Sequence, residues 1–220
     1  TKVNEFNALV LQRNKELEEI NKEITLTQKE IILAMGNVCE TRCQETASHV
    51  IRVAEVSRFI AELAGLPEED CHIIHTAAPM HDMGKIAIPD DILKKPGKFT
   101  PDEYKIMQSH CRIGFDIFKH SERPLLKAAS IIAHQHHERW DGTGYPQGLK
   151  GEEIHIYGRI TAIADVFDAL ISPRCYKKPW EAQKVFDYFK ENSGSKFDPV
   201  LSQLLIDNFT KAQDIINQYH

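Results

Sequence analysis

The sequence predicts an all-α protein, in which a helical bundle follows a long N-terminal helix. Apolar residues recur at intervals of three and four, which is typical of amphipathic helices. One such stripe comprises Val50, Val53, Ala54, Val56 and Ile60. An alternating pattern typical of strands persists only weakly, around residues 154–157. The 220 residues, 42% of them hydrophobic, suffice for one substantial core, so we expect one globular domain plus an extension.

The extension, residues 1–34, has the heptad pattern of a coiled coil. Every seventh position holds an apolar residue: Val3, Val10, Leu17, Ile24 and Ile31. The second seam position is apolar in Phe6, Ile20 and Ala34 and polar in Arg13 and Thr27. One interpretation is a parallel coiled-coil linker that joins two protomers into a homodimer and connects them to an upstream sensor domain. The alternative is an amphipathic helix that packs on its own domain.

Residues 35–220 form the predicted globular domain, the one that carries the candidate catalytic residues described below, and turn-forming residues divide it into helices. Breaks are expected at residues 65–67, 88–91 and 95–97 and in the polar stretch 141–153. The clearest helix start is at Thr100, the expected N-cap. Pro101 suits the first helical position, and Glu103 completes a capping box.

Composition excludes several classes of function. A net charge of −5 and a pI near 6.1 argue against binding to a nucleic acid polymer, which needs many cations on one face. The five cysteines are an odd number without CxxC pairs, which indicates reduced thiols and a cytoplasmic location. No apolar run approaches the roughly 18 residues of a membrane span, and no signal peptide is evident.

Histidine placement indicates metal chemistry, because eleven histidines are many for a chain of this size. The candidate ligands are His49, the pair His81-Asp82, His110 and the pair His136-His137. An imidazole fills one coordination position, whereas a carboxylate can bridge two cations. Glu45 lies four residues before His49 and shares its helix face. Asp165 lies in an apolar run, where a buried carboxylate needs a partner or a cation.

Each histidine could instead have a purely structural role, because a single imidazole on an apolar face is more often a hydrogen-bonded core residue than a ligand. We apply that interpretation to His72, His75, His120, His134 and His155. The metal hypothesis depends on the whole set. Five or six imidazoles and three carboxylates cannot all be buried cheaply in one helical domain without cations.

Four of the candidate ligands, His81, Asp82, His136 and His137, fall within two long motifs. His81-Asp82-Met83-Gly84-Lys85-Ile86 is followed by Ile88-Pro89, and residues 136–146 read HHERWDGTGYP. These segments resemble the HDxGKIxIP and HHExxDGxGYP signatures of HD-GYP domains, a branch of the HD phosphohydrolase superfamily. Further agreement occurs in residues 158–160, 165–170 and 196–199. The resemblance covers about residues 35–215.

The resemblance implies an all-helical HD fold that cleaves cyclic di-GMP to linear pGpG and, in some members, on to GMP. The family's metal ligands correspond to His49, His81, Asp82, His110, His136, His137 and Asp165. Asp82 matches the bridging carboxylate, and Glu45 matches the carboxylate associated with a third metal. Two or three metal ions are therefore expected, and the presence of Glu45 favours three.

Metal identity and mechanism follow from the ligand types. Imidazole and carboxylate without a cysteine ligand suit iron as the first choice and manganese as the second. Two such cations lower the pKa of a bridging water, so that hydroxide is available to attack phosphorus. Asp82 and Lys85 are the predicted catalytic residues. Lys85 is expected to contact a phosphate oxygen; the alternative is a surface lysine.

Five residues are predicted to bind substrate: Lys85, Gly144, Tyr145, Arg174 and Lys177. Gly142 and Gly144 permit close backbone approach, and Tyr145 either contacts substrate or anchors its loop. The resemblance implies that Arg174 and Lys177 grip the second phosphate, although Pro173 and Cys175 depart from the family pattern.

Two alternatives to a cyclic di-GMP phosphodiesterase remain at the level of sequence. One is a regulatory module that binds the dinucleotide or a partner without turnover. The other is an HD hydrolase that acts on another cyclic nucleotide, because metal chemistry is indifferent to the base. Lost ligands would mark the first alternative, and the expected ligands are all present.

Overall fold

The computed structural model describes residues 2–42, 47–173 and 178–219. Within these ranges the chain is helical and has no β-strand, only an isolated bridge between Ser193 and Phe197. The predicted all-α class is confirmed. The weak alternation at residues 154–157 leads into a helix, because the His155 ring caps α7 (Ile156–Ile171) and accepts a hydrogen bond from the Tyr157 N–H at 3.1 Å.

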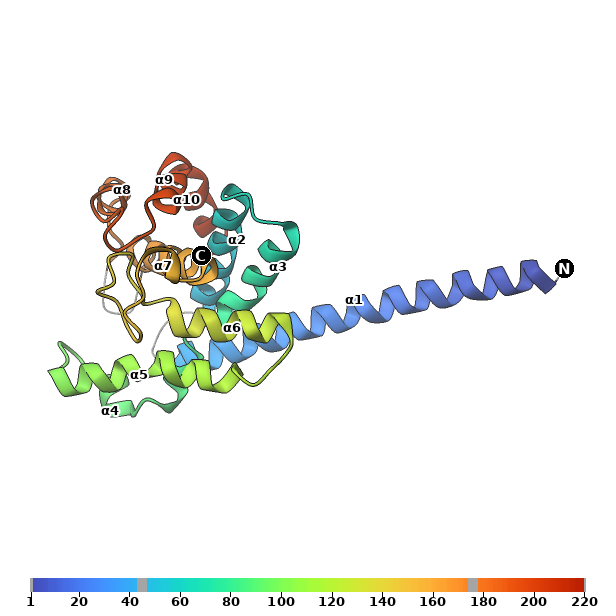
Figure 1. Cartoon of the computed structure of the whole chain (residues 1–220), viewed down its shortest axis with the longest axis horizontal. Helices are drawn as coiled ribbons and strands as arrows, with labels where there is room; N and C mark the ends of the chain where they lie inside the picture. The colour runs from blue at the N-terminus through green and yellow to red at the C-terminus, as the bar shows by residue number, and fades with distance from the viewer. Residues whose placement is uncertain (1, 43–46, 174–177, 220) are drawn as a thin grey trace.

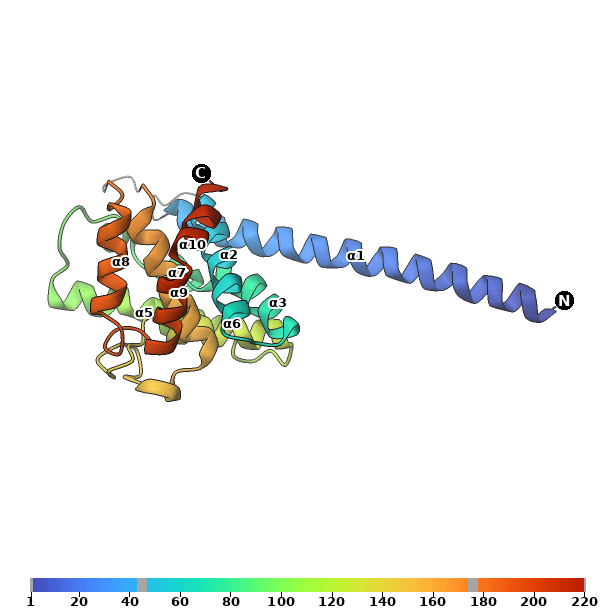
Figure 2. The ribbon, with the colours of Figure 1, turned by 90° about the horizontal axis from the view of Figure 1, so that it is seen from above.

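Helix α1 (Lys2–Arg42) projects away from the domain, as Figures 1 and 2 show in two views. Its apolar heptad residues are exposed, among them Val3, Val10, Leu17 and Ile24. The first buried residue is Ile32. The alternative in which this helix packs on its own domain is therefore wrong for residues 2–28, whereas Lys29 and Ile32 line a cavity beside α2 and α3. The predicted domain boundary at residue 34 falls inside this continuous helix.

The domain is a bundle around α2 (Ala47–Leu63), which contacts α1, α3, α7 and α10. The other elements are α3 (Glu68–Ala77), α4 (Asp90–Leu93), α5 (Pro101–Phe118), α6 (Pro124–Gln135), α8 (Ala182–Glu191), α9 (Pro199–Asp207), α10 (Phe209–Asn217) and the 3₁₀ turns η1 (Ala78–Met80), η2 (Met83–Ala87) and η3 (Gly151–Glu153). Large side chains such as Phe167, Phe189 and Ile60 are fully buried in the core. Their burial holds together the helices that carry the site residues.

Local sequence fixes where α5 begins. The Thr100 hydroxyl accepts a hydrogen bond from the Glu103 N–H at 3.3 Å, and the Thr100 N–H donates to Glu103 Oε2 at 2.7 Å. The predicted capping box is confirmed. Because α5 begins here, His110 falls on the face that packs against η2 and α6.

Cysteine burial and helix hydrophobicity bear on two further expectations. Cys39, Cys71 and Cys111 are buried, whereas Cys43 and Cys175 lie outside the described residues. Among the helices that the structure describes, none is both long enough and apolar enough to cross a membrane.

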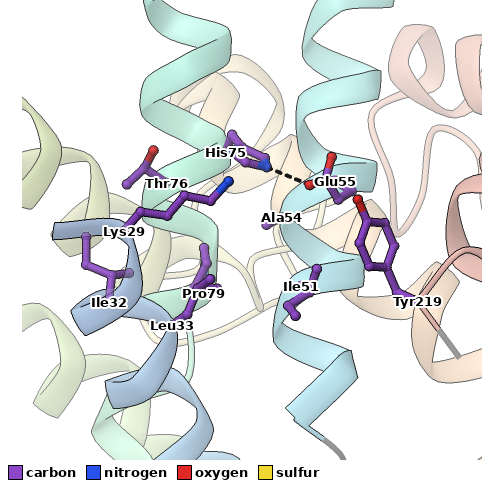
Figure 3. Close-up of a pocket in the computed structure, with 10 residues that line it drawn as sticks. All are labelled: Lys29, Ile32, Leu33, Ile51, Ala54, Glu55, His75, Thr76, Pro79 and Tyr219. Atoms are coloured by element: carbon purple, nitrogen blue, oxygen red, sulfur yellow. Dashed lines mark hydrogen bonds and ion pairs between the residues drawn. The ribbon is translucent and has the colours of Figure 1, made fainter. Parts of the chain in front are cut away.

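A small cavity of about 170 Å³ lies where α1 meets α2 and α3 (Figure 3). Ile32 from α1 and Ala54 from α2 line it, and the His75 ring points at Glu55, with 3.0 Å between His75 Nε2 and Glu55 Oε1. His75 is thus the hydrogen-bonded core residue that the sequence predicts.

Candidate metal centre

The centre begins at His81 and Asp82, which follow the tight turns at the end of α3. The His81 side chain is fully buried, and its Nδ1 lies 2.9 Å from the Ala78 carbonyl oxygen. A carbonyl oxygen can only accept, so Nδ1 carries a hydrogen and Nε2 is the atom left to bind a cation. The backbone therefore fixes His81 in the tautomer that a metal ligand needs.

Three other imidazoles are also held by a hydrogen bond at Nδ1. Nδ1 of His110 donates to the Met107 carbonyl at 2.6 Å, and Nδ1 of His136 donates to the Ile132 carbonyl at 3.0 Å. His49 on α2 instead uses a side chain, because its Nδ1 lies 2.6 Å from Asp168 Oδ2. In each ring Nδ1 is engaged and Nε2 is the atom left to bind a cation, which is the arrangement of metal-binding histidines.

The Asp82 carboxylate lies among these Nε2 atoms. Asp82 Oδ1 is 3.3 Å from His110 Nε2 and 3.6 Å from His136 Nε2, and Asp82 Oδ2 is 3.2 Å from His81 Nε2. The Lys85 ammonium also donates a hydrogen bond to Asp82 Oδ2. The two carboxylate oxygens thus face different imidazoles, as a bridging ligand requires.

The ligand atoms fall into two groups, each with all its members within 4.8 Å of one another. The first group comprises His110, Cys111, His136 and His137, and the second comprises Glu40, His49 and His81. Asp82 lies between the groups, and Asp165 Oδ1 is 3.6 Å from His49 Nε2. The structure therefore brings together every predicted metal ligand that it describes. Glu45 lies outside the described residues.

Unsatisfied buried atoms test whether cations fit this centre. In the part of the chain that the structure describes, His81 Nε2, Asp82 Oδ1 and Glu40 Oε2 are buried without a hydrogen-bond partner. Such atoms are rare because burying them without a partner is unfavourable. Cations between imidazole nitrogens and carboxylate oxygens would satisfy them. Burial raises the pKa of the Cys111 thiol, which keeps this group neutral at pH 7. The other donors of the centre are nitrogen and oxygen atoms.

Charge and burial set the protonation of the centre. Burial lowers the pKa of His110 to about 4 and that of His137 well below its usual value, so both are neutral at pH 7. Burial also disfavours protonated His81, but the adjacent Asp82 outweighs it and raises the pKa of His81 to about 9. Burial alone would raise the pKa of Asp82, yet Lys85 and His81 hold it well below the ordinary value. The carboxylate is therefore charged and ready to bind cations.

Asp168 is a site residue that the sequence does not single out. It is buried and bonded to His49, and its Oδ1 accepts from Arg52 Nε at 2.5 Å and from Ser172 Oγ at 2.8 Å. Burial raises the pKa of Asp168, but His49 and Arg52 more than compensate and keep it ionised. Asp168 therefore positions the His49 ring. A second acid three residues after Asp165 in an apolar run was the available signal.

The Gly-Tyr-Pro loop closes over one side of the centre. The Tyr145 N–H donates to the His137 carbonyl at 3.2 Å, and the two rings lie 4.8 Å apart between centroids. A Cβ on Gly144 would come within 2.3 Å of the backbone nitrogen of Arg139. The glycine therefore allows the backbone of its own loop, not a substrate, to approach closely. Gly142 has φ +83°, which glycine adopts readily. These contacts favour the interpretation of Tyr145 as a loop anchor.

A cavity of about 370 Å³ adjoins this loop and the first group of histidines. His136, His137, Tyr145, Arg139 and Lys196 are among the residues that line it. Arg139 and Lys196 are cations that the sequence interpretation missed. Their only signal was position, because Arg139 lies within the HHERWDGTGYP motif and Lys196 immediately precedes Phe197-Asp198-Pro199. Arg174 and Lys177, the predicted phosphate contacts, lie outside the described residues.

Residues 33–201 match the sequence profile of the family described as HD domain. The chain belongs to the HD domain family. The match includes the described residues of both ligand groups and Asp82, and it confirms the superfamily predicted from the motifs.

Curated relatives of this HD domain are phosphodiesterases by name. It is 46% identical over 194 residues to "3'3'-cGAMP-specific phosphodiesterase 2" of Vibrio cholerae, covering 87% of this chain and 37% of the relative. It is 41% identical over 197 residues to "Cyclic di-GMP phosphodiesterase response regulator RpfG" of Xanthomonas campestris, covering 90% and 52%. A "Cyclic di-GMP phosphodiesterase" of Thermotoga maritima is 42% identical over 203 residues, covering 86% and 55%. The chain thus spans between about a third and just over half of each relative's length.

Solved structures support the fold of this HD domain. The crystal structure of a cyclic GMP-AMP specific phosphodiesterase of V. cholerae, V-cGAP3, superposes with a TM-score of 0.63 at 19% identity, covering 86% of this chain and 53% of the other. The HD domain of L. monocytogenes phosphodiesterase PgpH gives a TM-score of 0.54 at 15% identity, covering 86% and 99%. At these identities the likeness concerns the fold, and it confirms the predicted HD-type helical bundle.

Proposed function

We propose that this HD domain is a metal-dependent phosphodiesterase that hydrolyses cyclic di-GMP to linear pGpG, with further cleavage to GMP as the alternative end point. The observation that carries the proposal is the Asp82 carboxylate between two groups of imidazole ligands. The names of the curated relatives support a cyclic dinucleotide as the substrate class.

The cations would be held by His49, His81, Asp82, His110, His136, His137 and Asp165, with Glu45 as a further ligand if three ions bind. Nitrogen and oxygen donors favour iron, with manganese as the second choice. When bound, such cations supply a water of lowered pKa and neutralise charge on the scissile phosphate.

Positively charged side chains of the protein would bind and orient the substrate. Lys85 lies against Asp82, so its ammonium is within reach of a phosphate at the same centre. Arg139 and Lys196 line the adjoining cavity and, with Arg174 and Lys177, would receive the second phosphate. Tyr145 would hold the loop closed over His137.

Helix α1 would connect this activity to a partner. Its exposed heptads suit a parallel coiled coil with a second copy of the chain, which makes a homodimer whose linker, residues 1–34, continues into an upstream sensor domain. Sedimentation of the whole chain and of a chain beginning at residue 35 tests this, because only the longer chain should dimerise.

A second substrate is favoured by one observation, the 46% identity to a phosphodiesterase named as specific for 3'3'-cGAMP. Metal-loaded protein should therefore be incubated in parallel with cyclic di-GMP and 3'3'-cGAMP, and the products separated. Formation of pGpG supports the proposal, and cleavage of 3'3'-cGAMP alone would replace the substrate. Binding of either dinucleotide without hydrolysis would instead favour the regulatory module.

A further inference from the structure

Glu40, a residue of α1 that the resemblance does not mark as a ligand, lies inside the metal centre. Its carboxylate and the ligand nitrogens of His49 and His81 lie within 4.8 Å of one another. The side chain is only 2% exposed, although carboxylates are almost never fully buried without a partner. We propose that Glu40 is a ligand of a cation shared with His49 and His81. The proposal rests on the proposed function and deepens it.

Packing at the end of α1 places Glu40 in this position. One turn earlier, a Cβ on Gly36 would lie 2.8 Å from the Pro79 carbonyl and 3.0 Å from a Val50 methyl. Glycine at this point therefore lets α1 approach both α2 and the turn that precedes His81. Residues four apart share a helix face, so Glu40 points the same way as Gly36. Gly36 contacts Val50 and Pro79, and Glu40 lies beside His49 and His81, which are near them in the sequence.

Arg42 fixes the same end of α1 from the other side. Its guanidinium donates to the carbonyls of Lys85 at 3.2 Å and Ile88 at 3.1 Å and pairs with Asp90 at 2.6 Å. These partners belong to the segment that carries Asp82. The helix end is therefore held between α2 and η2, and Glu40 is positioned by contacts other than its own.

Buried polar atoms without hydrogen bonds, in the group formed by Glu40, His49 and His81, indicate a cation. Among the described residues, Glu40 Oε2 and His81 Nε2 have no hydrogen-bond partner, and the second nitrogen of His49 is already occupied by Asp168. Ligands on opposite sides of one cation lie about 4 to 5 Å apart, given bond lengths of about 2.0 to 2.6 Å. The separations in the group suit a single ion, which would satisfy the carboxylate and the imidazoles together.

A ligand on α1 joins the stalk to the chemistry. The same helix presents its exposed heptads to a partner and its buried end to the centre. A displacement of α1 along its axis would therefore move a ligand of this cation.

The test is a count of ions bound per chain. Wild-type protein, Glu40→Gln, Glu45→Gln and the control Glu30→Gln on the exposed face of α1 are loaded anaerobically with Mn²⁺, freed of unbound metal and assayed by elemental analysis. Glu40→Gln should bind one ion fewer than wild type, and Glu30→Gln the same number. The rise in melting temperature on adding Mn²⁺ should also be smaller for Glu40→Gln.

Unchanged ion content and an unchanged Mn²⁺-induced melting shift in Glu40→Gln would overturn the proposal, most clearly if Glu45→Gln loses an ion. If Glu40→Gln fails to fold by circular dichroism, Glu40→Asp replaces it: a folded variant with weaker Mn²⁺ affinity supports the ligand, and wild-type affinity overturns it. Absence of bound ions in the wild type would instead refute the proposed function itself.

Discussion

Two buried histidines, His75 and His81, lie six residues apart and have opposite surroundings. His75 has one acid, Glu55, at 3.0 Å, and this pair borders a small cavity beside α1. His81 has Asp82 at 3.2 Å, but two further imidazoles, His49 and His136, and the Glu40 carboxylate converge on the same place, and its Nε2 has no hydrogen bond to any described residue. Burial therefore does not distinguish a ligand from a core histidine. The number of converging donors with unmet bonds does.

The largest effect is expected from Asp82→Asn. Loss of the charge between the two groups should remove at least one bound ion and lower kcat by about a thousandfold or more, since metal assistance contributes several kcal/mol to the barrier. The matched control is Glu55→Gln at the satisfied pair, which should retain full metal content and rate. Elemental analysis and steady-state kinetics measure both variants. If Asp82→Asn kept its bound ions and its kcat as Glu55→Gln does, the contrast between the two histidine sites would be wrong.

Lys85→Ala separates chemistry from metal binding at the same centre. Removal of a cation beside the scissile phosphate should lower kcat by about a hundredfold, while ion content stays at the wild-type value. Kinetics and elemental analysis on the same sample provide the check. A variant with wild-type kcat would leave Lys85 only the role of an ion-pair partner of Asp82.

Asp168→Asn tests the carboxylate that orients His49. The amide cannot accept the same charged hydrogen bonds, so the affinity for Mn²⁺ should fall by about 10- to 100-fold, as for other residues that hold a metal ligand in place. The buried Arg52 would also lose its counter-charge, which destabilises the fold. Mn²⁺ titration at a temperature where the variant is folded measures the first effect. An unchanged dissociation constant would show that His49 needs no support.

The smallest expected effect is the pH dependence of the stabilisation that the His75–Glu55 pair provides. The hydrogen bond from His75 lowers the pKa of Glu55 below its ordinary value of 4.5, although burial opposes this. The stabilisation is therefore present above about pH 4.5 and is lost as the pH falls through the depressed pKa of the folded state. It should amount to less than about 1 kcal/mol because the pair is partly exposed. Urea unfolding of wild type and Glu55→Gln from pH 7 to pH 3 should show the difference shrinking, and a growing difference would contradict this sign.

Local chemistry made some features predictable from sequence and left others out of reach. The α5 capping box lies within four residues, and His81, Asp82, His136 and His137 lie in contiguous motifs, so both could be read directly. The heptads of α1 indicated an apolar face but not which partner covers it, since a stripe has the same pattern in either case.

Contacts between distant segments could not be predicted. Asp168 meets His49 from 119 residues away, and Glu40 reaches His81 only because α1 packs closely at Gly36. Lys196 reaches the cavity from beyond α8, where no local pattern marks it. Such residues are found from the fold, because sequence spacing says nothing about which helices become neighbours.

The central claim is that the two groups of ligands bind cations on either side of Asp82. A crystal of the chain grown with saturating Mn²⁺ tests it most directly, through anomalous scattering measured at the manganese absorption edge. We expect separate anomalous peaks, one within reach of His110, His136 and His137 and another within reach of His49 and His81, with Asp82 oxygens between them. An ordered centre without an anomalous peak at either place would contradict it.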